Sequence, residues 1–164
     1  IEEDFFPLNI YNEIVQQMIS VDYAPPSSKQ IKSLKGSYWH THTIPNNCDV
    51  QNQIKKLIGK KFKFDVLNFS NSVYTMVGAN DVPRPHIDKS EKVKYQCLIF
   101  MHGEESTNNG TGFYAMNKLK ELELSIHVGF KCNRAIFFSS DVYHTPLQWA
   151  GNGSFRYSIC NFFT

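Results

Sequence analysis

The residues in this sequence best suited to chemistry are two histidines, one aspartate and one arginine. His86 and Asp88 are separated by one residue, His144 follows later in the chain, and Arg156 comes after it. Two imidazoles and one carboxylate form the ligand set that holds non-haem Fe(II) on one face and leaves other positions open. A guanidinium pairs with a carboxylate through two parallel hydrogen bonds. The order therefore predicts a metal site with an anchor for an acidic cosubstrate beyond it.

The spacing of these residues suggests how the chain brings them together. On a strand, His86 and Asp88 leave the same face. The turn signal Gly151-Asn152-Gly153 predicts a hairpin that sets His144 opposite Cys160 and Gln148 opposite Arg156. Arg156 would then lie about 13 Å along the strand from His144, a gap that an extended arginine and a five-carbon diacid can bridge. Ser158 would face the same side as Arg156 and donate a second hydrogen bond to the diacid.

The composition is that of an ordinary globular chain. The length of 164 residues suits one domain, and 41% hydrophobic and 20% charged residues exclude a disordered protein. A net charge of +2 does not favour a nucleic-acid partner. The 4 cysteines are far apart and form no CxxC pair, which predicts a reducing, cytoplasmic location. No apolar run is long enough to span a membrane, and Ile1–Asp4 lacks the basic segment of a secretory signal.

Helical patterns come first in the chain and strand patterns follow. Apolar residues recur at helical spacing from Leu8 to Ile19, after Pro7, and again from Val50 to Ile58, with Gly59 as the expected end. Short apolar runs separated by turn residues then predict strands, at 62–69, 73–77, 85–88, 95–101, 112–115, 135–138, 144–149 and 155–163. The segment Asn108-Asn109-Gly110 is a turn signal. Two helices followed by about eight strands predict helices packed on a β-sandwich or jelly roll.

The motifs resemble those of a known family. His86-x-Asp88, His144 and Arg156-x-Ser158 are similar, in order and approximate spacing, to the Fe(II)/2-oxoglutarate-dependent dioxygenases. The resemblance spans Val73 to Phe163, and the stretches 85–92 and 111–114 look similar to small uncharacterised or phage-type members. It implies a mainly β fold with flanking helices, a double-stranded β-helix of the jelly-roll, cupin-like kind. In a single domain, residues 1–61 would form a helical part packed on a barrel core of residues 62–164.

The resemblance also implies roles for single residues. His86, Asp88 and His144 would bind Fe(II), while Arg156 and Ser158 would hold the far carboxylate of 2-oxoglutarate. By the same analogy Tyr74 would contact 2-oxoglutarate. Tyr114 is a candidate for contact with the substrate. The implied activity uses O2 to hydroxylate a C–H bond, with release of succinate and carbon dioxide.

Departures from the family's subgroups limit the substrate class. Prolyl hydroxylases usually carry lysine where Arg156 stands, and alkylation-repair members carry a second arginine where this chain has Asn161–Thr164. Halogenating members lack the carboxylate that Asp88 supplies. The expected substrate is therefore a small molecule or a protein side chain, with nucleic acid not favoured.

Two other interpretations also fit the sequence. His40 and His42 form a second histidine pair at the same spacing, which could begin a cupin-type metal site, although no later Glu and His follow at that site's spacing. The chain could also be a non-catalytic, cupin-like β-sandwich that binds a metal or ligand. Consumption of 2-oxoglutarate would separate an enzyme from such a module.

Overall fold

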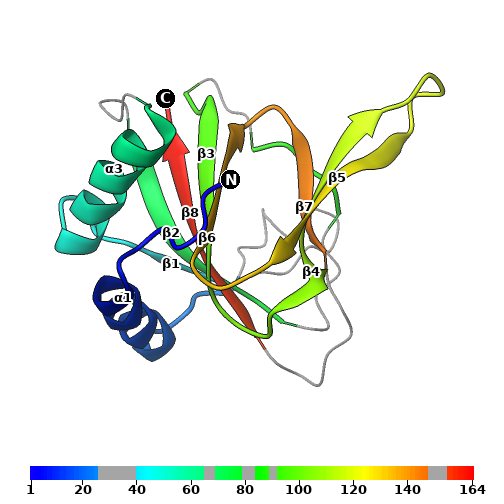
Figure 1. The fold of residues 1–164 in the computed structure, drawn as a ribbon. Coiled ribbons are helices and arrows are strands. Elements are labelled where there is room, and N and C mark those ends of the chain that lie inside the picture. The colour runs from blue at the N-terminus through cyan, green and yellow to red at the C-terminus, as the bar shows by residue number, and fades with distance from the viewer. Residues whose placement is uncertain (26–39, 65–68, 79–83, 89–91, 148–154) are drawn as a thin grey trace.

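The computed structural model describes residues 1–25, 40–64, 69–78, 84–88, 92–147 and 155–164. Within these ranges, eight strands form two antiparallel sheets that face each other, and two helices cover the outer face of the larger sheet (Figure 1). The arrangement confirms the predicted mainly β fold with flanking helices.

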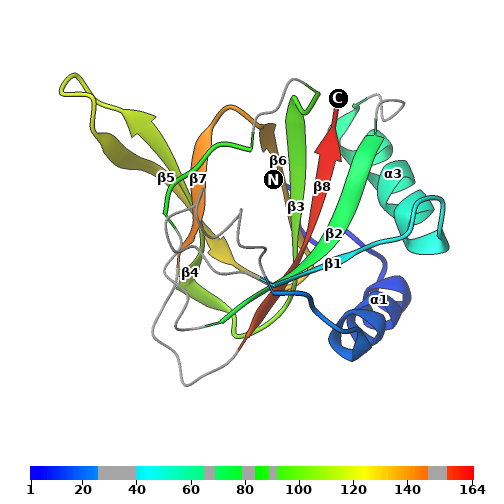
Figure 2. The same cartoon turned by 180° about the vertical axis from the view of Figure 1, so that it is seen from behind.

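The last strand of the chain lies in the middle of the larger sheet. The strand order in this sheet is β1-β2-β8-β3-β6, and in the smaller sheet it is β5-β4-β7. The larger sheet consists of β1 (His40–Thr43), β2 (Phe69–Val77), β3 (Tyr95–His102), β6 (Arg134–Ser139) and β8 (Arg156–Phe163). The smaller sheet consists of β4 (Ser106–Met116), β5 (Leu122–Phe130) and β7 (Tyr143–Leu147). Because β8 pairs with both β2 and β3, most ladder contacts join segments far apart in sequence (Figure 2).

The two helices are amphipathic and bury one face each. Helix α1 (Leu8–Ser20) follows Pro7, which is tolerated there because the first N–H groups of a helix have no partner inside it. Helix α3 (Asp49–Phe62) lies beside it on the same face of the larger sheet (Figure 1). Their buried apolar residues are Ile14, Val15, Met18, Ile54 and Ile58.

The end of α3 differs from the sequence prediction. The helix passes through Gly59 and ends at Phe62, and Lys63 takes a left-handed conformation with φ 52°. The ring of Phe62 stacks on Phe137 of β6 with centroids 5.3 Å apart. This packing extends the helix by a turn against the poor helix propensity of glycine. The predicted strand from Phe62 is therefore wrong in its first residues, and residues 65–68 lie outside the described ranges.

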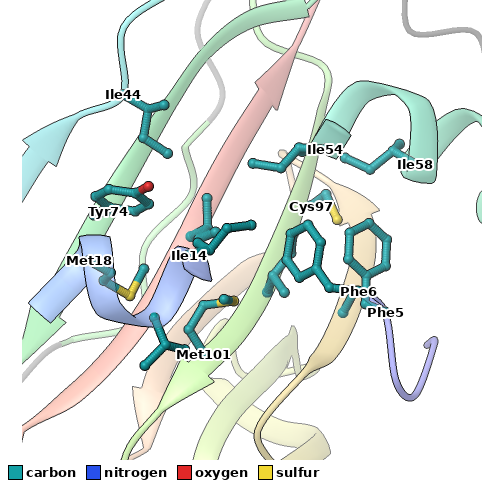
Figure 3. Close-up of a cluster of buried hydrophobic side chains, with 14 of the residues drawn as sticks. Phe5, Phe6, Ile14, Met18, Ile44, Ile54, Ile58, Tyr74, Cys97 and Met101 are labelled. Atoms are coloured by element: carbon teal, nitrogen blue, oxygen red, sulfur yellow. The ribbon is translucent and has the colours of Figure 1, made fainter. Parts of the chain in front are cut away.

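The main core lies between the helices and the larger sheet. Figure 3 shows how α1 and α3 and the N-terminal segment meet the sheet there. The fully buried side chains in this cluster include Phe5, Phe6, Met18, Ile54, Ile58, Tyr74, Cys97, Ile99, Met101, Ile159 and Phe163. A second, smaller cluster lies between the two sheets and contains Phe100, Phe113, Val128, Phe130 and Ile136.

Alternation along β8 separates the core from the space between the sheets. Ile159 and Phe163 belong to the helix-side core. Arg156, Ser158 and Cys160 face the opposite way and line a cavity. Since successive side chains of a strand leave opposite faces, one strand contributes both to the core and to the cavity.

Two strands were not predicted from the sequence. The His40–Thr43 strand β1 adds an edge to the larger sheet, and β5 extends from Leu122 to Phe130. The predicted turn Asn108-Asn109-Gly110 is wrong, because these residues lie inside strand β4. The turn at Gly151–Gly153 lies outside the described residues. No helix in the described ranges has the length and apolar character needed to cross a bilayer.

Candidate metal centre

A cavity of about 310 Å³ lies between the two sheets. This volume is at the lower end of the range of small-molecule sites. Its lining residues from the larger sheet are Thr41, Asn71, Val73, Thr75, Val77, Gln96, Leu98, Phe138, Arg156, Ser158, Cys160 and Phe162. The smaller sheet and the segment before β3 add His86, Asp88, Thr111, His144 and Pro146. All three predicted metal ligands and the predicted anchor thus line one cavity.

The three predicted metal ligands form one compact cluster. Their ligand atoms all lie within 4.8 Å of one another. His86 Nε2 is 3.6 Å from Asp88 Oδ1, and His144 Nε2 is 3.5 Å from Asp88 Oδ2. A bridge between the main chains of His86 and His144, with N–H···O distances of 3.0 and 2.9 Å, fixes the two histidines side by side.

Each imidazole is oriented by a backbone carbonyl. His86 Nδ1 lies 2.9 Å from the carbonyl oxygen of Arg84, and His144 Nδ1 lies 3.0 Å from that of Val142. In both cases the carbonyl can only accept a hydrogen bond, so Nδ1 is the donor and Nε2 is the ring nitrogen that faces Asp88. A metal-binding histidine is commonly held in this way by a second hydrogen bond. The cluster therefore fits a divalent metal ion with two imidazole ligands and one carboxylate ligand.

The electrostatics of the cluster favour the forms that bind a cation. Burial lowers the pKa of His86, and this outweighs the opposing effect of the Asp88 carboxylate. Burial would raise the pKa of Asp88, but the imidazoles of His144 and His86 and the amide of Gln96 together lower it. A neutral imidazole and an ionised carboxylate are the protonation states that a metal ion requires.

Gln96 is a residue of this site that the sequence reasoning missed. It lies on β3, is 3% exposed and faces the cavity beside Asp88. Its Nε2 makes no hydrogen bond at bonding distance within the described residues, yet the amide lies near enough to help lower the pKa of Asp88. Only the strand register of β3 reveals that Gln96 faces the metal cluster.

Arg156 is buried at one end of the cavity without an acidic partner among the described residues. Its Nη1 donates to Asn109 Oδ1 at 2.9 Å, to the Gly110 carbonyl at 2.6 Å and to the Leu147 carbonyl at 3.4 Å, all neutral acceptors. Its Nε is buried and makes no hydrogen bond in the same part of the chain. Burial lowers the pKa of Arg156 to about 10, so the side chain still carries its charge at neutral pH. A buried cation without a counter-charge is costly, which favours an anionic ligand at this place.

Further polar groups surround the arginine. Ser158 is 4% exposed and lines the cavity on the same face of β8 as Arg156, two residues further along the strand. Thr75, on the neighbouring strand, donates its hydroxyl to the Ser158 carbonyl at 3.2 Å. Thr111 is 1% exposed, and its hydroxyl is buried without a hydrogen-bond partner within the described ranges. Thr111 was not singled out in the sequence, because nothing local marks a threonine on a strand as unpaired.

The predicted hairpin between His144 and Arg156 is wrong. His144 lies on β7, which pairs with β4, whereas Arg156 lies on β8, which pairs with β2 and β3. The two residues therefore belong to opposite sheets and face each other across the cavity. Since the guanidinium contacts the Leu147 carbonyl, and Leu147 is three residues beyond His144 on β7, the anchor lies about 10 Å from His144 along that strand. The span remains suited to a five-carbon diacid.

Two other predicted contacts do not reach the cavity. Tyr74 is 1% exposed in the helix-side core, where its ring stacks on His42 and its hydroxyl is 3.5 Å from Gln17 Oε1. The alternation of β2 turns Thr75 into the cavity and Tyr74 away from it, so Tyr74, predicted to contact 2-oxoglutarate, does not line the cavity. Tyr114, the candidate substrate contact, is half-buried on β4 beside Tyr143 and is not among the cavity-lining residues.

The alternative histidine pair lies on the other face of the larger sheet. Thr41, between His40 and His42, lines the cavity, so both histidines leave the opposite side of β1. His42 Nδ1 lies 2.9 Å from the Asp22 carbonyl oxygen. The cluster of His86, Asp88 and His144 is the metal-binding candidate found among the described residues, and the pair on β1 has no part in it.

No protein-family model matches the chain, and no curated protein matches it in sequence. Solved structures do match. The chain aligns with a prolyl-4-hydroxylase from Pseudomonas putida at a TM-score of 0.68 and 13% identity, over 99% of this chain and 90% of that one. It aligns with a prolyl hydroxylase from Trichoplax adhaerens, in complex with a hypoxia inducible factor peptide fragment, at a TM-score of 0.68 and 12% identity. This alignment covers 99% of this chain and 81% of that one. An oxidoreductase of the 2OG-Fe(II) oxygenase family from Burkholderia pseudomallei aligns at a TM-score of 0.66 and 9% identity, over 100% of this chain and 83% of that one.

At these identities the similarity establishes the fold. The chain adopts the double-stranded β-helix found in Fe(II)/2-oxoglutarate oxygenases, as its motifs predicted, and it carries a His-Asp-His cluster in the cavity between the sheets.

Proposed function

We propose that this protein is an Fe(II)- and 2-oxoglutarate-dependent oxygenase that hydroxylates a C–H bond of a small molecule or of a protein side chain. The observation that carries the proposal is the presence of two complementary sites in one cavity. One site offers two imidazoles and a carboxylate, and the other offers a buried guanidinium with no acidic partner among the described residues. A ligand that chelates a metal at one end and carries a carboxylate at the other satisfies both.

The chain's own residues would divide the work as follows. His86, Asp88 and His144 would hold Fe(II) through the two Nε2 atoms and the carboxylate, with the Arg84 and Val142 carbonyls keeping the imidazoles in place. When bound, Fe(II) and 2-oxoglutarate would supply the oxidising chemistry, in which O2 is consumed, 2-oxoglutarate becomes succinate and carbon dioxide, and the substrate gains one oxygen atom.

The acidic end of 2-oxoglutarate would lie against Arg156 and Ser158. Both side chains are buried, so their hydrogen bonds to a carboxylate would meet little competition from water. The rings of Phe100 and Phe130, each with its centroid 5.7 Å from the Arg156 guanidinium carbon, line the other side of the cation and exclude solvent. Cys160 lies nearby as a free thiol, and burial raises its pKa to about 12, so it stays neutral beside the ligand.

The solved structures with this fold support the general kind of reaction and leave the substrate open. Two of them are described as prolyl hydroxylases, whereas SnoN, which aligns at a TM-score of 0.67 and 9% identity, is described as an epimerase. A second SnoN structure is a complex with Fe3+ and alpha-ketoglutarate. Hydroxylation is the proposed outcome for this chain because Asp88 completes the ligand set.

The experiment is a turnover assay without added substrate. The purified protein would be incubated with Fe(II), ascorbate, O2 and 2-oxoglutarate, and succinate would be measured by mass spectrometry. We expect slow succinate release from the wild type and none above background from Asp88→Ala. The matched control is His127→Ala, which removes an exposed imidazole on β5 and should leave succinate release unchanged.

A binding measurement separates the enzyme from a non-catalytic module. Binding of Mn(II), followed by 2-oxoglutarate, would be measured by calorimetry. Binding of both with no succinate release under any condition would point to a binding module, and failure to bind either would overturn the proposal.

A further inference from the structure

The first part of strand β4 leaves the ladder with β5. Ser106 pairs with Phe130, but the next paired residues are Gly110 and Gly129, so residues 107–109 of β4 have no counterpart on β5. Gly110 closes this bulge with φ +149°, and a Cβ there would lie 2.0 Å from the Val128 carbonyl oxygen. Bulges of this kind redirect side chains, and they are frequent beside active sites.

The side chain that this bulge redirects is Asn109. Its Oδ1 accepts a hydrogen bond from Arg156 Nη1 at 2.9 Å, and the Gly110 carbonyl accepts from the same nitrogen at 2.6 Å. With the Leu147 carbonyl at 3.4 Å, three acceptors share the two hydrogens of Nη1. Nε takes none of these bonds and is buried without a partner within the described residues. The edge of the guanidinium formed by Nε and Nη2 is therefore the one left for a ligand.

We propose that Asn109 is a positioning residue for the anion anchor. It holds Nη1 against the smaller sheet, so that the Nε–Nη2 edge faces the cavity, and it does so without charge. The identification of the anion as 2-oxoglutarate rests on the proposed function. An aspartate could accept the same hydrogen bond, but its charge would neutralise Arg156 and compete with the carboxylate of the ligand.

Because Asn109 is neutral, adding a negative charge at this position should affect stability and ligand binding in opposite directions. Asn109→Asp should form a buried ion pair with Arg156, so the melting temperature of the metal-free protein should stay the same or rise. The same change should weaken binding of 2-oxoglutarate to the Mn(II)-loaded protein by about tenfold or more. A purely structural role would move stability and binding in the same direction.

The experiment compares three variants with the wild type. Asn108→Asp is the matched control, because Asn108 is the exposed neighbour in the same bulge and carries the charge away from Arg156. Asn109→Ala removes the acceptor, and it should raise the KM for 2-oxoglutarate while kcat changes little. The dissociation constants of Mn(II) and then of 2-oxoglutarate would be measured by calorimetry, and melting temperatures by circular dichroism.

The outcomes separate this inference from the proposed function. Unchanged Mn(II) affinity, weakened 2-oxoglutarate binding in Asn109→Asp and wild-type binding in Asn108→Asp would support it. Equal weakening in both aspartate variants, or wild-type binding in Asn109→Asp, would overturn it. If Asn109→Asp does not fold, the KM of Asn109→Ala decides, and an unchanged KM counts against the inference. A wild type that binds Mn(II) but no 2-oxoglutarate would instead refute the proposed function itself.

Discussion

Some side chains in this cavity are held by residues that are distant in sequence, as Arg156 is by Asn109 and Gly110. The spacing of His86 and Asp88 predicted that the two side chains lie together, and the structure brings them together with His144, although residues 85–88 form only an isolated bridge at His86 and not the predicted strand. The unpaired groups of Gln96 and Thr111 were not readable, because whether a polar side chain finds a partner depends on strands distant in sequence. The local part of the site was therefore predictable, and the long-range part was not.

The unpaired hydroxyl of Thr111 leads to a prediction about the acidic ligand. If it donates to the carboxylate held by Arg156, Thr111→Val should weaken 2-oxoglutarate binding about three- to tenfold, the usual worth of one hydrogen bond. The stability of the metal-free protein should stay the same or rise slightly, because valine removes a buried group that has no partner in the described residues. Calorimetry and thermal melts would measure both. Thr107→Val, an exposed change in the same strand, is the control, and equal affinities for the two variants would contradict the prediction.

The lowered pKa of His86 leads to a prediction about acid stability without metal. Its pKa lies below the ordinary value of 6.5 because burial disfavours the charged imidazole. The unfolded chain therefore binds a proton at a higher pH than the folded one, and the free energy of unfolding should fall as the pH drops below about 6.5. The measurement is urea unfolding of the metal-free protein between neutral and mildly acidic pH. His86→Gln should flatten this dependence, and a variant with the full wild-type slope would show that other groups cause it.

Among the elements, strand β4 shows how a local signal can be misread. Asn-Gly sequences are typical of two-residue hairpin turns, and Asn108-Asn109-Gly110 was predicted as a turn on that basis. The glycine does take a positive φ, at +149°, but it closes a bulge within a strand. Asn108-Asn109-Gly110 is compatible with a hairpin turn and with a bulge, and only the pairing of β4 with β5 and β7 shows that it forms a bulge. The hairpin expected between β7 and β8 failed for a related reason, since each strand found partners in a different sheet.

The geometry of the bulge predicts that Gly110 cannot be replaced. Gly110→Ala should lower the free energy of unfolding by more than about 3 kcal/mol, because a Cβ would overlap the Val128 carbonyl oxygen and the backbone conformation disfavours any side chain. Denaturant unfolding would measure the loss. Gly129→Ala is the matched control in the facing strand, where a Cβ would lie 3.1 Å from the Thr107 Cα, and it should cost about 1 kcal/mol. Losses of equal size would mean that the bulge is not the cause.

At the scale of the whole molecule, one face of the larger sheet packs against the helices in the core, and the other face lines the cavity with the candidate metal site. Helices α1 and α3 cover the first, and the smaller sheet encloses the second (Figure 1). The sequence predicted the fold class, since two helical patterns precede a series of short strands. It could not assign a face to each residue, and Tyr74, for which the family resemblance implied a contact with 2-oxoglutarate, belongs to the helix-side core. The assignment requires the register of each strand, which depends on the complete set of strand pairs.

This division predicts opposite effects for truncations on the two faces. Ile159 on β8 is completely buried against the helices, so Ile159→Ala should cost about 2–5 kcal/mol of stability. Leu98 on β3 is half-buried and lines the cavity, so Leu98→Ala should cost much less because part of the space it leaves is already open. Leu98→Ala should instead change the affinity of the Mn(II)-loaded protein for 2-oxoglutarate or for a substrate, whereas folded Ile159→Ala should bind like the wild type. Denaturant unfolding and calorimetry on both variants would test this. If Leu98→Ala lost as much stability as Ile159→Ala and kept its affinity, the space between the sheets would be core rather than a binding site.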